Sequence, residues 1–456
     1  MKTIVAQATA LGASGLAIIR VSGPEAFNIV SKLFSGNKDI LEAASHTILY
    51  GNFIDNGTII DDITVSIFKK PHSYTGEDVI EIGCHGGKII TLNIINSLIR
   101  NGCELAKPGE FTQRAFVNGK IDLVQAEAVV DLINSISVIG AITSARQLRG
   151  GFTKNLNDLY DNLLKVASLL ELELDFAEDA ISITNRNEIE YNLLNVKNIC
   201  QKLIDSYKSA TILREGFFVA IVGLPNSGKS TLFNAMLNKN RAIVTDIPGT
   251  TRDYIEDVMF IDNVAIKLID TAGLRKTVDY IEAEGIKLVY NKLDEANLII
   301  FLRDITENNK DKELKLFNSI KEKYKNQKFL LVNNKIDLIV NKNNNSLTKL
   351  NDDCNVVNIS AKNKKDIDKL KSIIIEIANN CVEIEEDILL NQRQFLLLNQ
   401  TIKSVDSAIN GLKNNISNEF IAIDIRNAAN ALGAVAGKNW NEEVLNSIFS
   451  KFCIGK

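Results

Sequence analysis

The sequence has few of the residues from which disulfide frameworks and structural metal sites are built. Its six cysteines are scattered over 456 residues without a C-x-x-C pair, and it holds only three histidines, which are dispersed. Secreted disulfide scaffolds and structural zinc sites need paired cysteines or clustered histidines. The sequence therefore argues against both, and it predicts a protein of the reducing cytoplasm.

Three further absences limit the class of protein. No apolar run is long enough to cross a bilayer. The first ten residues lack the basic region and the apolar core of a secretory signal. The formal net charge is −4, so the surface is not broadly basic. We expect no membrane association, and contact with nucleic acid would require a local patch or another subunit.

What is present is an ordinary globular composition, 45% apolar and 24% charged, in a chain too long for one core. The pattern of strands and helices predicts four segments, bounded as 1–119, 120–212, 213–380 and 381–456. The first is a small α+β domain. Strands are expected at 18–21, 63–68 and 79–82, a hairpin turn at 55–57 and a helix at 88–100.

From residue 120 the pattern becomes helical. Asp122 followed by Gln125 predicts a capping box, and apolar residues between Leu156 and Leu174 recur with a 3.6-residue period. A strand at 217–222 then opens a section of alternating strands and helices that reaches about residue 379, after which the chain is helical again. We expect an α/β domain inserted into a helical one.

The inserted section carries a phosphate-binding motif. Residues 223–230 read GLPNSGKS, which satisfies G-x-x-x-x-G-K-[ST] between a strand and a helix. Its glycines let backbone N–H groups and a helix N-terminus converge on phosphates. Lys229 can reach the β- and γ-phosphates, and the Ser230 hydroxyl is a Mg²⁺ ligand.

Further motifs indicate guanine. In the sequence NKID at 334–337, the Asp337 carboxylate can accept from guanine N1–H and the 2-amino group, which adenine lacks. The sequence SAK at 360–362 supplies the partner loop. The sequence DTAG at 270–273 brings Asp270 toward Mg²⁺ and the Gly273 N–H toward the γ-phosphate, and Thr251 is placed to complete the Mg²⁺ shell. This order of motifs predicts a Ras-like P-loop GTPase domain.

One expected residue is absent. Many GTPases orient the attacking water with a glutamine directly after the DTAG glycine, but Leu274 stands there. A leucine side chain has no hydrogen-bonding group. Another residue must therefore orient the water, or hydrolysis is very slow.

With these motifs, the chain resembles the tRNA-modifying GTPases of the MnmE/TrmE family over nearly its whole length. The G-domain motifs that carry the resemblance are DIPGTTRD (246–253), DTAGLR (270–275) and LREG (213–216). The motifs that lie outside the G domain are TGED (75–78), HGG (85–87), PGEFT (108–112), LVQAEA (123–128) and the terminal FCIGK (452–456). The terminal CIGK is very specific to that family.

The resemblance implies an architecture, an activity and partners. The fold would be an N-terminal tetrahydrofolate-binding domain that dimerises, a discontinuous helical domain and an inserted G domain. Together with the flavoprotein MnmG, in a heterotetramer-type complex, the family modifies C5 of the wobble uridine of certain tRNAs. The modification is of the carboxymethylaminomethyl type. The one-carbon unit comes from a reduced folate, 5,10-methylenetetrahydrofolate or a 5-formyl analogue.

The resemblance also implies how GTP is hydrolysed. Hydrolysis would depend on K⁺-driven pairing of G domains, with K⁺ ligands that correspond to Asn226, Thr245, Ile247 and Thr250. The water-orienting carboxylate corresponds to Glu282, which answers the missing glutamine. Motifs and resemblance together predict GTP contacts from Asn226, Ser227, Gly228, Lys229, Ser230, Thr231, Thr245, Asp246, Ile247, Pro248, Gly249, Thr250, Thr251, Asp270, Thr271, Ala272, Gly273, Asn334, Lys335, Asp337, Ser360, Ala361 and Lys362.

For the folate pocket, the resemblance points to Arg20, Glu81, Lys120 and Lys456. A carboxylate suits the amino and ring N–H donors of a pterin, and cations suit a glutamate tail. Taken singly, each of the four is an ordinary surface charge. Cys453 falls on a functional position of the family, and the alternative for it is a buried structural thiol.

Two other function classes stay open at this point. A regulatory or ribosome-assembly GTPase would act by binding alone, but such proteins append a basic RNA-binding domain, and no basic stripe follows residue 380. In a scaffold protein the G domain would only gate assembly. The terminal CIGK and the Arg20 and Glu81 domain favour the enzyme. The residues leave open whether tRNA contacts this chain or mainly its partner.

Overall fold

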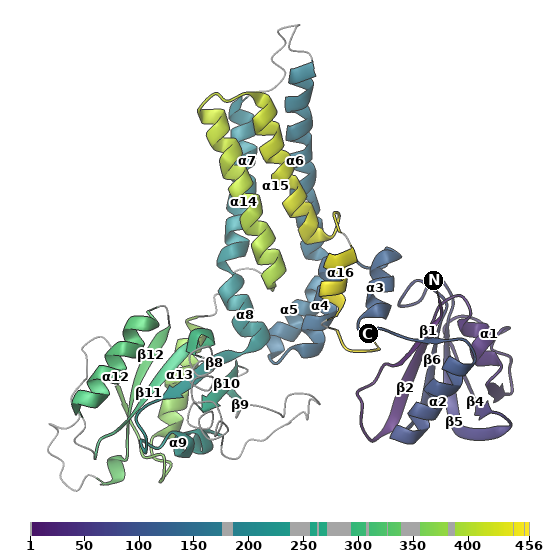
Figure 1. Cartoon of the computed structure of the whole chain (residues 1–456), viewed down its shortest axis with the longest axis horizontal. Helices are drawn as coiled ribbons and strands as arrows, with labels where there is room; N and C mark the ends of the chain where they lie inside the picture. The colour runs from purple at the N-terminus through teal and green to yellow at the C-terminus, as the bar shows by residue number, and fades with distance from the viewer. Residues whose placement is uncertain are drawn as a thin grey trace. The chain divides into compact units, whose positions relative to one another are not determined.

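The chain divides into two compact units in the computed structural model, and Figure 1 labels the helices and strands of which they consist. The first comprises Met1–Val130, Ser144–Gln201 and Gln392–Lys456, and the second comprises Asp131–Thr143 and Lys202–Asn391. The structure describes residues 2–175, 186–237, 256–261, 264–270, 293–306, 310–325, 327–338, 356–381, 388–440, 442–450 and 452–455.

A seven-stranded sheet organises the N-terminal part of the first unit, in the order β3-β4-β5-β6-β2-β1-β7. Neighbouring strands are antiparallel except for the parallel pair β1 and β7. The strands are β1 (Ile4–Gln7), β2 (Ser14–Ser22), β3 (Phe34–Gly36), β4 (Thr47–Asp55), β5 (Thr58–Phe68), β6 (Val79–Gly86) and β7 (Glu104–Leu105). This confirms the predicted α+β domain and its hairpin turn.

The two faces of this sheet differ in what covers them. On one face, α1 (Ala26–Ser31) and α2 (Lys88–Arg100) bury the inward side chains of β2 and β6. Ile19 and Ile82 are representative of that core and are fully buried. On the other face, Phe111 of α3 (Glu110–Val117) packs with Ile4 of β1. Because side chains alternate along a strand, Arg20 lies on this second face.

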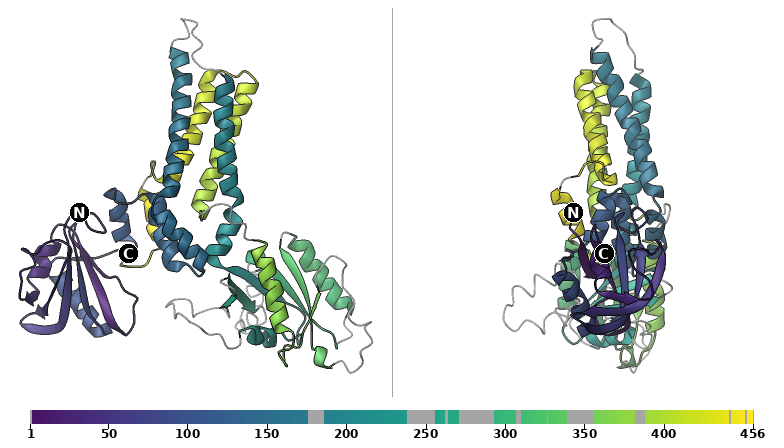
Figure 2. Two further views of the ribbon diagram at one scale, coloured as in Figure 1. Left: turned by 180° about the vertical axis from the view of Figure 1, so that it is seen from behind. Right: turned by 90° about the vertical axis from the view of Figure 1, so that its right-hand side faces the viewer.

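Four long helices lie side by side in a bundle, as both views of the chain show (Figure 2). They are α6 (Gly151–Asp175), α7 (Arg186–Asp205), α14 (Gln392–Lys413) and α15 (Asn418–Ala436). The predicted period of α6 is confirmed, because Leu156, Leu163 and Leu170 are each 1% exposed. Ion pairs between Lys197 and Asp406 (2.6 Å) and between Glu171 and Arg426 (2.6 Å) link neighbouring helices.

Three shorter helices also belong to the helical part of the chain, among the residues that the structure describes: α4 (Leu123–Asn134), α5 (Val138–Leu148) and α16 (Glu442–Phe449). The predicted capping box opens α4. The Asp122 N–H donates to Gln125 Oε1 (2.9 Å), and the Gln125 N–H donates to Asp122 Oδ1 (2.8 Å). These bonds satisfy two backbone donors that the first turn of a helix leaves unpaired.

A buried charge cluster fixes the start of α14 against α4. Arg393 binds Glu127 through Nε (2.7 Å) and Nη2 (2.8 Å), and Gln394 donates to the same carboxylate (2.7 Å). The Arg393 guanidinium also donates to the carbonyls of Ala434 and Val435 at the end of α15. Three helices distant in sequence are therefore linked through the Arg393 guanidinium.

The second unit is built on a six-stranded sheet in the order β13-β12-β11-β8-β10-β9, parallel except for β9. Its strands are β8 (Phe217–Val222), β9 (Glu256–Ile261), β10 (Val264–Asp270), β11 (Leu298–Asp304), β12 (Lys328–Asn334) and β13 (Val356–Asn358). Its helices are α8 (Tyr207–Glu215), α9 (Lys229–Met236), α12 (Lys310–Lys323), α13 (Ile367–Asn379) and the 3-10 helix η2 (Ile336–Leu338).

Both faces of this second sheet are buried. Val219 and Ile221 of β8 pack with α9 and α13. Ala220, on the other face, belongs to a buried cluster that includes Phe317 of α12. Parallel strands covered on both sides read as continuous apolar runs, which is why residues 217–222 were recognisable in the sequence. The predicted inserted α/β domain is confirmed. No helix in the described ranges combines the length and hydropathy that a membrane span requires.

Candidate functional site

The predicted phosphate loop joins β8 to α9 at the carboxyl edge of the parallel sheet. Gly228 is the N-cap of α9 with φ of 94°, in the left-handed region that favours glycine. A Cβ on Gly223 would lie 2.2 Å from the Leu302 carbonyl oxygen of the neighbouring strand, so only glycine fits there. The loop conformation therefore depends on the glycines that the motif specifies.

Side chains of this loop are poised at the N-terminus of α9. The Lys229 ammonium donates to the carbonyls of Gly223 (3.2 Å) and Leu224 (2.9 Å), inside the loop. Asn226 is exposed with φ of 64°, and Ser230 and Thr231 are exposed at the helix start. The Ser227 hydroxyl is buried and finds no hydrogen-bond partner within the described residues. An unpartnered buried hydroxyl fits a loop that closes on an acceptor such as a phosphate.

Asn334 connects three of the predicted motifs. Its Nδ2 donates to the Ser227 carbonyl in the phosphate loop (2.9 Å), and its Oδ1 accepts from the Ala361 N–H (3.0 Å). Asn334 is 2% exposed. One buried amide thus holds the phosphate loop, the NKID segment and the SAK segment together.

The predicted guanine-binding residue lies beside this junction. Asp337 is exposed in η2, and its Oδ1 accepts from the Ser360 hydroxyl (2.6 Å). Ser360 is fixed by paired backbone bonds with Lys365, and Lys362 is exposed on the same turn. The carboxylate is oriented through one oxygen, and no hydrogen bond from a described residue reaches the other.

Lys335 and Asp304 form an ion pair that the sequence alone did not reveal. Asp304 ends β11 directly beside Asn334 of β12. Burial alone would raise the pKa of Asp304. Hydrogen bonds from Lys335 and Thr306, with the Lys335 charge, outweigh it and hold the pKa below its ordinary value.

Arg20 and Glu81, both predicted for folate, are paired across β2 and β6. They are register partners, and Arg20 contacts Glu81 Oε1 through Nε (2.9 Å) and Nη2 (2.8 Å). Their side chains are 12% and 24% exposed. The Arg20 guanidinium lies over the rings of Tyr74 (4.9 Å to the centroid) and Phe111 (5.6 Å). Charge and aromatic surface are therefore combined at one partly open position.

Comparison with known proteins decides the family. A model described as the GTP-binding protein TrmE N-terminus matches residues 3–120, and one described as the MnmE helical domain matches residues 123–453. The chain belongs to the MnmE/TrmE family.

Whole-length relatives agree with this membership. The tRNA modification GTPase MnmE of Flavobacterium johnsoniae is 42% identical over 461 residues, covering 100% of this chain and 99% of the relative. That of Christiangramia forsetii is 40% identical over 469 residues, with the same coverage of each chain. Among solved structures, the G domain of the T. maritima FeoB iron transporter covers 36% of this chain and 98% of its own, at 29% identity and a TM-score of 0.28.

As a member of this family, the chain is a GTPase, an enzyme that binds and hydrolyses GTP. The predicted family, fold class and GTPase activity are confirmed. The predicted domain limits and the roles of individual residues stay predictions. Several of these residues lie outside the described part of the chain: Thr245, Asp246, Ile247, Pro248, Gly249, Thr250, Thr251, Thr271, Ala272, Gly273, Glu282 and Lys456. Asp270 is described in its backbone as the end of β10, beside Ile221 of β8.

The family's terminal segment reaches the Arg20 face of the N-terminal sheet. The Gly455 carbonyl accepts from Arg20 Nη1 (3.4 Å), and the Cys453 carbonyl accepts from the Gly109 N–H (3.4 Å). Gly455 has φ of 97°, and a Cβ there would lie 2.1 Å from the Gln7 carbonyl oxygen. The Cys453 side chain is exposed, so the alternative of a buried structural thiol is wrong.

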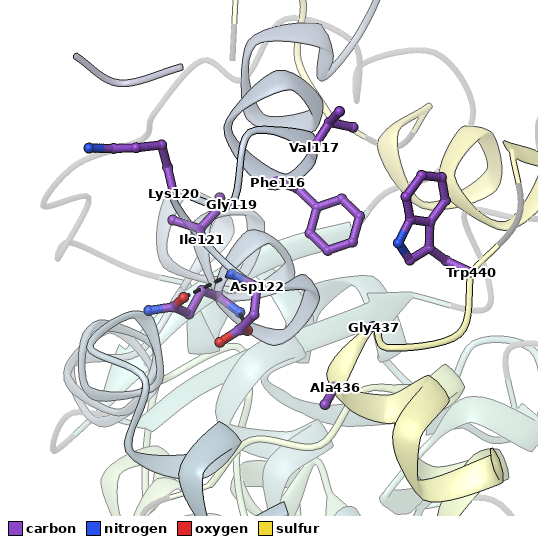
Figure 3. Close-up of a pocket in the computed structure, with 10 residues that line it drawn as sticks. Phe116, Val117, Gly119, Lys120, Ile121, Asp122, Ala436, Gly437 and Trp440 are labelled. Atoms are coloured by element: carbon purple, nitrogen blue, oxygen red, sulfur yellow. Dashed lines mark hydrogen bonds between the residues drawn. The ribbon is translucent and has the colours of Figure 1, made fainter. Parts of the chain in front are cut away.

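Lys120 lines a pocket of 440 Å³ whose lining includes neither Arg20 nor Glu81 (Figure 3). Phe116 and Trp440, which also line this pocket, make an edge-to-face contact at 5.7 Å between ring centroids, and Lys120 points away from them. The Lys120 ammonium donates to the Pro71 carbonyl (3.1 Å). Within the described residues, the structure thus brings together two of the four predicted folate residues and leaves Lys120 on neighbouring surface.

Sequence reasoning missed three residues at these sites. Tyr74 and Phe111 flank Arg20 from loops and helices 54 and 91 residues away in sequence from it, and Asp304 holds Lys335 from a different strand. Only Asp304 carried a local signal, because it and Arg303 are the two charged residues that end an otherwise apolar strand.

Proposed function

We propose that this chain is the GTP-hydrolysing component of a cytoplasmic complex that modifies C5 of the wobble uridine in tRNA. The added group would be of the carboxymethylaminomethyl type, with one carbon drawn from a reduced folate. The observation that carries the proposal is the coexistence of two sites in one chain of this family. One is the loop junction at Asn334, and the other is the Arg20–Glu81 pair.

In the nucleotide site, Lys229 would leave its loop carbonyls for the β- and γ-phosphate oxygens of GTP. Asp337 would accept from guanine, using the oxygen that Ser360 does not engage. Ser230 and Thr251 are the residues that would hold Mg²⁺, which neutralises phosphate charge when bound. The hydroxyl of Ser230, exposed at the start of α9, is a ligand type that Mg²⁺ prefers.

Asn226, Thr245, Ile247 and Thr250 would hold K⁺, which supplies positive charge near the phosphates when bound. Asn226 offers an exposed amide oxygen on the phosphate loop, a donor suited to a hard cation. Glu282 would orient the attacking water in place of the leucine at position 274. The chain's own contribution to hydrolysis is therefore to hold the phosphates with Lys229 and the water with Glu282.

For a reduced folate, the Arg20–Glu81 pair is a chemically suitable pterin site. Both contacts between Arg20 and Glu81 are made to Oε1, so Oε2 is the oxygen left to accept from the amino and ring N–H donors. The rings of Tyr74 and Phe111 provide apolar surface beside it. Lys120 and Lys456 would meet the anionic glutamate tail. Bound folate supplies the one-carbon unit, and these residues bind and orient it.

The same face of the sheet supports the proposed homodimer. Ile48 and Tyr50 of β4 are 70% and 68% exposed, and Leu16 of β2 is 61% exposed. Cross-strand register places Ile48, Ser66, Glu81 and Arg20 in one row. Exposed apolar side chains gathered on one face are typical of an interaction surface. The flavoprotein MnmG and tRNA are the further proposed partners.

The decisive experiment is mass spectrometry of wobble-uridine nucleosides from cells lacking this protein. We expect the carboxymethylaminomethyl-type nucleosides to disappear and to return on complementation with the wild-type chain. Complementation with Glu81→Gln tests the folate site separately and should restore little modification. Unchanged nucleosides in the deletion strain would overturn the proposal.

A further inference from the structure

Asp304 lies beside the NKID segment (334–337) but belongs to the neighbouring strand. It is the last residue of β11, and the register of β11 with β12 sets it directly beside Asn334. Lys335, the next residue along the chain, has φ of 66° and turns its ammonium to the Asp304 carboxylate. Asp337, the proposed guanine-binding residue, follows two positions later.

The Asp304 carboxylate is fully engaged. One oxygen binds Lys335, and the other accepts from the Thr306 N–H (3.0 Å) and the Thr306 hydroxyl (2.6 Å). Its side chain is 4% exposed, whereas that of Lys335 is 31% exposed. A buried carboxylate with these partners is rigid, so it fixes the end of an otherwise flexible lysine side chain.

Without this anchor, Lys335 would have a competing partner. A lysine ammonium is a compact charge on a flexible stem, and the Asp337 carboxylate lies two residues away in the same turn. Asp337 has one oxygen that Ser360 does not engage, which is the oxygen that guanine needs. An ion pair between Lys335 and Asp337 would occupy that oxygen and weaken recognition of the guanine 2-amino group.

We propose that Asp304 is a specificity-determining positioning residue, which holds the Lys335 ammonium away from Asp337 and so leaves the Asp337 carboxylate to guanine. The proposal rests on the guanine site proposed above. It assigns a role to a residue outside the nucleotide-binding motifs. The lowered pKa of Asp304 agrees with it, because the carboxylate stays charged at neutral pH.

The test uses the full chain with Asp304→Asn, which keeps the shape and removes the charge. We expect GDP affinity to fall roughly 10- to 100-fold, the range for a hydrogen bond to a charged group. Affinity for inosine diphosphate, which lacks the 2-amino group, should fall less, so the GDP-to-IDP affinity ratio should shrink. A partly unfolded sample lowers both affinities equally and leaves this ratio unchanged. Asp294→Asn, at an exposed carboxylate of the same unit, is the control and should bind both nucleotides normally.

A double-mutant cycle separates positioning from simple structural support. In a Lys335→Met background there is no ammonium to hold, so Asp304→Asn should cost no affinity and can even restore some. An equal loss in both backgrounds, or an unchanged GDP-to-IDP ratio in Asp304→Asn, would overturn the proposal. Asp337→Asn distinguishes the failures: if it leaves GDP binding intact, the guanine site itself is misassigned.

Discussion

The two sheets of this protein carry their candidate sites in different ways. The parallel sheet of the second unit places its site at the carboxyl edge, in loops whose residues are contiguous in sequence, such as 223–230 and 334–337. The N-terminal sheet places its site on a face, where Arg20 meets Glu81 across two strands and Gly455 comes from the other end of the chain. An edge site can be read as a motif, whereas a face site exists only once the strands have paired.

The burial of the two strands also decides how easily a functional residue can be recognised in the sequence. Every residue of β11 is buried, so the two charged residues at its end, Arg303 and Asp304, stand out from the apolar residues before them. In β2, buried and less buried residues alternate along most of the strand, so Arg20 reads like any outward-facing side chain. A polar residue therefore indicates a functional site when it interrupts an apolar strand. It gives no such indication in a strand where polar and apolar residues alternate.

The largest effect is expected from a single substitution in the edge site. Asp337→Asn presents an amide to the guanine donors, and loss of such a paired contact costs about 10⁴ in discrimination. GTP affinity should collapse and xanthosine triphosphate affinity should rise, as measured by nucleotide titration. Stability should change by less than about 0.5 kcal/mol because Asp337 is exposed. Asp368→Asn, exposed on α13, is the control, and unchanged GTP binding by Asp337→Asn would refute the assignment.

A second prediction concerns Glu282, which no contiguous phosphate motif contains. Glu282→Ala should retain GTP affinity and lose about 10²–10⁴ in turnover, because a positioned water-orienting carboxylate contributes that much. Steady-state hydrolysis in saturating KCl is the measurement, and Glu284→Ala should stay near the parent rate. Equal rates for Glu282→Ala and the parent would mean that the carboxylate lies elsewhere.

A smaller effect is expected at the face site. Glu81→Gln should reduce affinity for 5-formyltetrahydrofolate roughly 10- to 100-fold, because it removes a charged acceptor. GTP turnover should not change, since the pair belongs to the other unit. Calorimetry on the full chain measures it, with Glu104→Gln of the exposed Lys2–Glu104 pair as the control. Normal folate binding by Glu81→Gln would contradict the pterin assignment.

The smallest effect tests a feature that is local in sequence but lies outside both sites. Asp122→Ala removes the cap of α4 and should cost about 1 kcal/mol in unfolding free energy. Asp122→Asn keeps an acceptor and should be nearly neutral, as should Asp158→Ala at an exposed position of α6. Urea unfolding monitored by circular dichroism measures all three. A neutral Asp122→Ala would show that α4 is held by packing alone.

The difference between local sequence patterns and contacts across paired strands explains which parts of the fold and the sites could be predicted from the sequence. The strand at 217–222, the helix at 88–100 and the capping box at Asp122 follow from local pattern, and each is confirmed. The guanine and phosphate motifs were read from spacing, because their residues are neighbours along the chain. Arg20 and Glu81 were identified only through family resemblance, and the rings of Tyr74 and Phe111 were missed. Their proximity depends on strand register and on helix α3, neither of which local sequence encodes.

The ends of the insert have a consequence for how the chain folds. Arg214 donates to the Leu390 carbonyl (3.5 Å) and Ser209 to the Cys381 carbonyl (3.3 Å), so the segment's entry and exit are held together within its own unit. In the bundle, the Lys197–Asp406 and Glu190–Lys413 pairs show that α7 and α14 run antiparallel. In the connectivity of the chain, the nucleotide-binding domain is therefore the connection between two antiparallel helices, α7 and α14. Because loop-closure entropy rises with the logarithm of length, and a folded insert with adjoining ends behaves as a short loop, the folded insert adds little to the entropic cost of pairing α7 with α14.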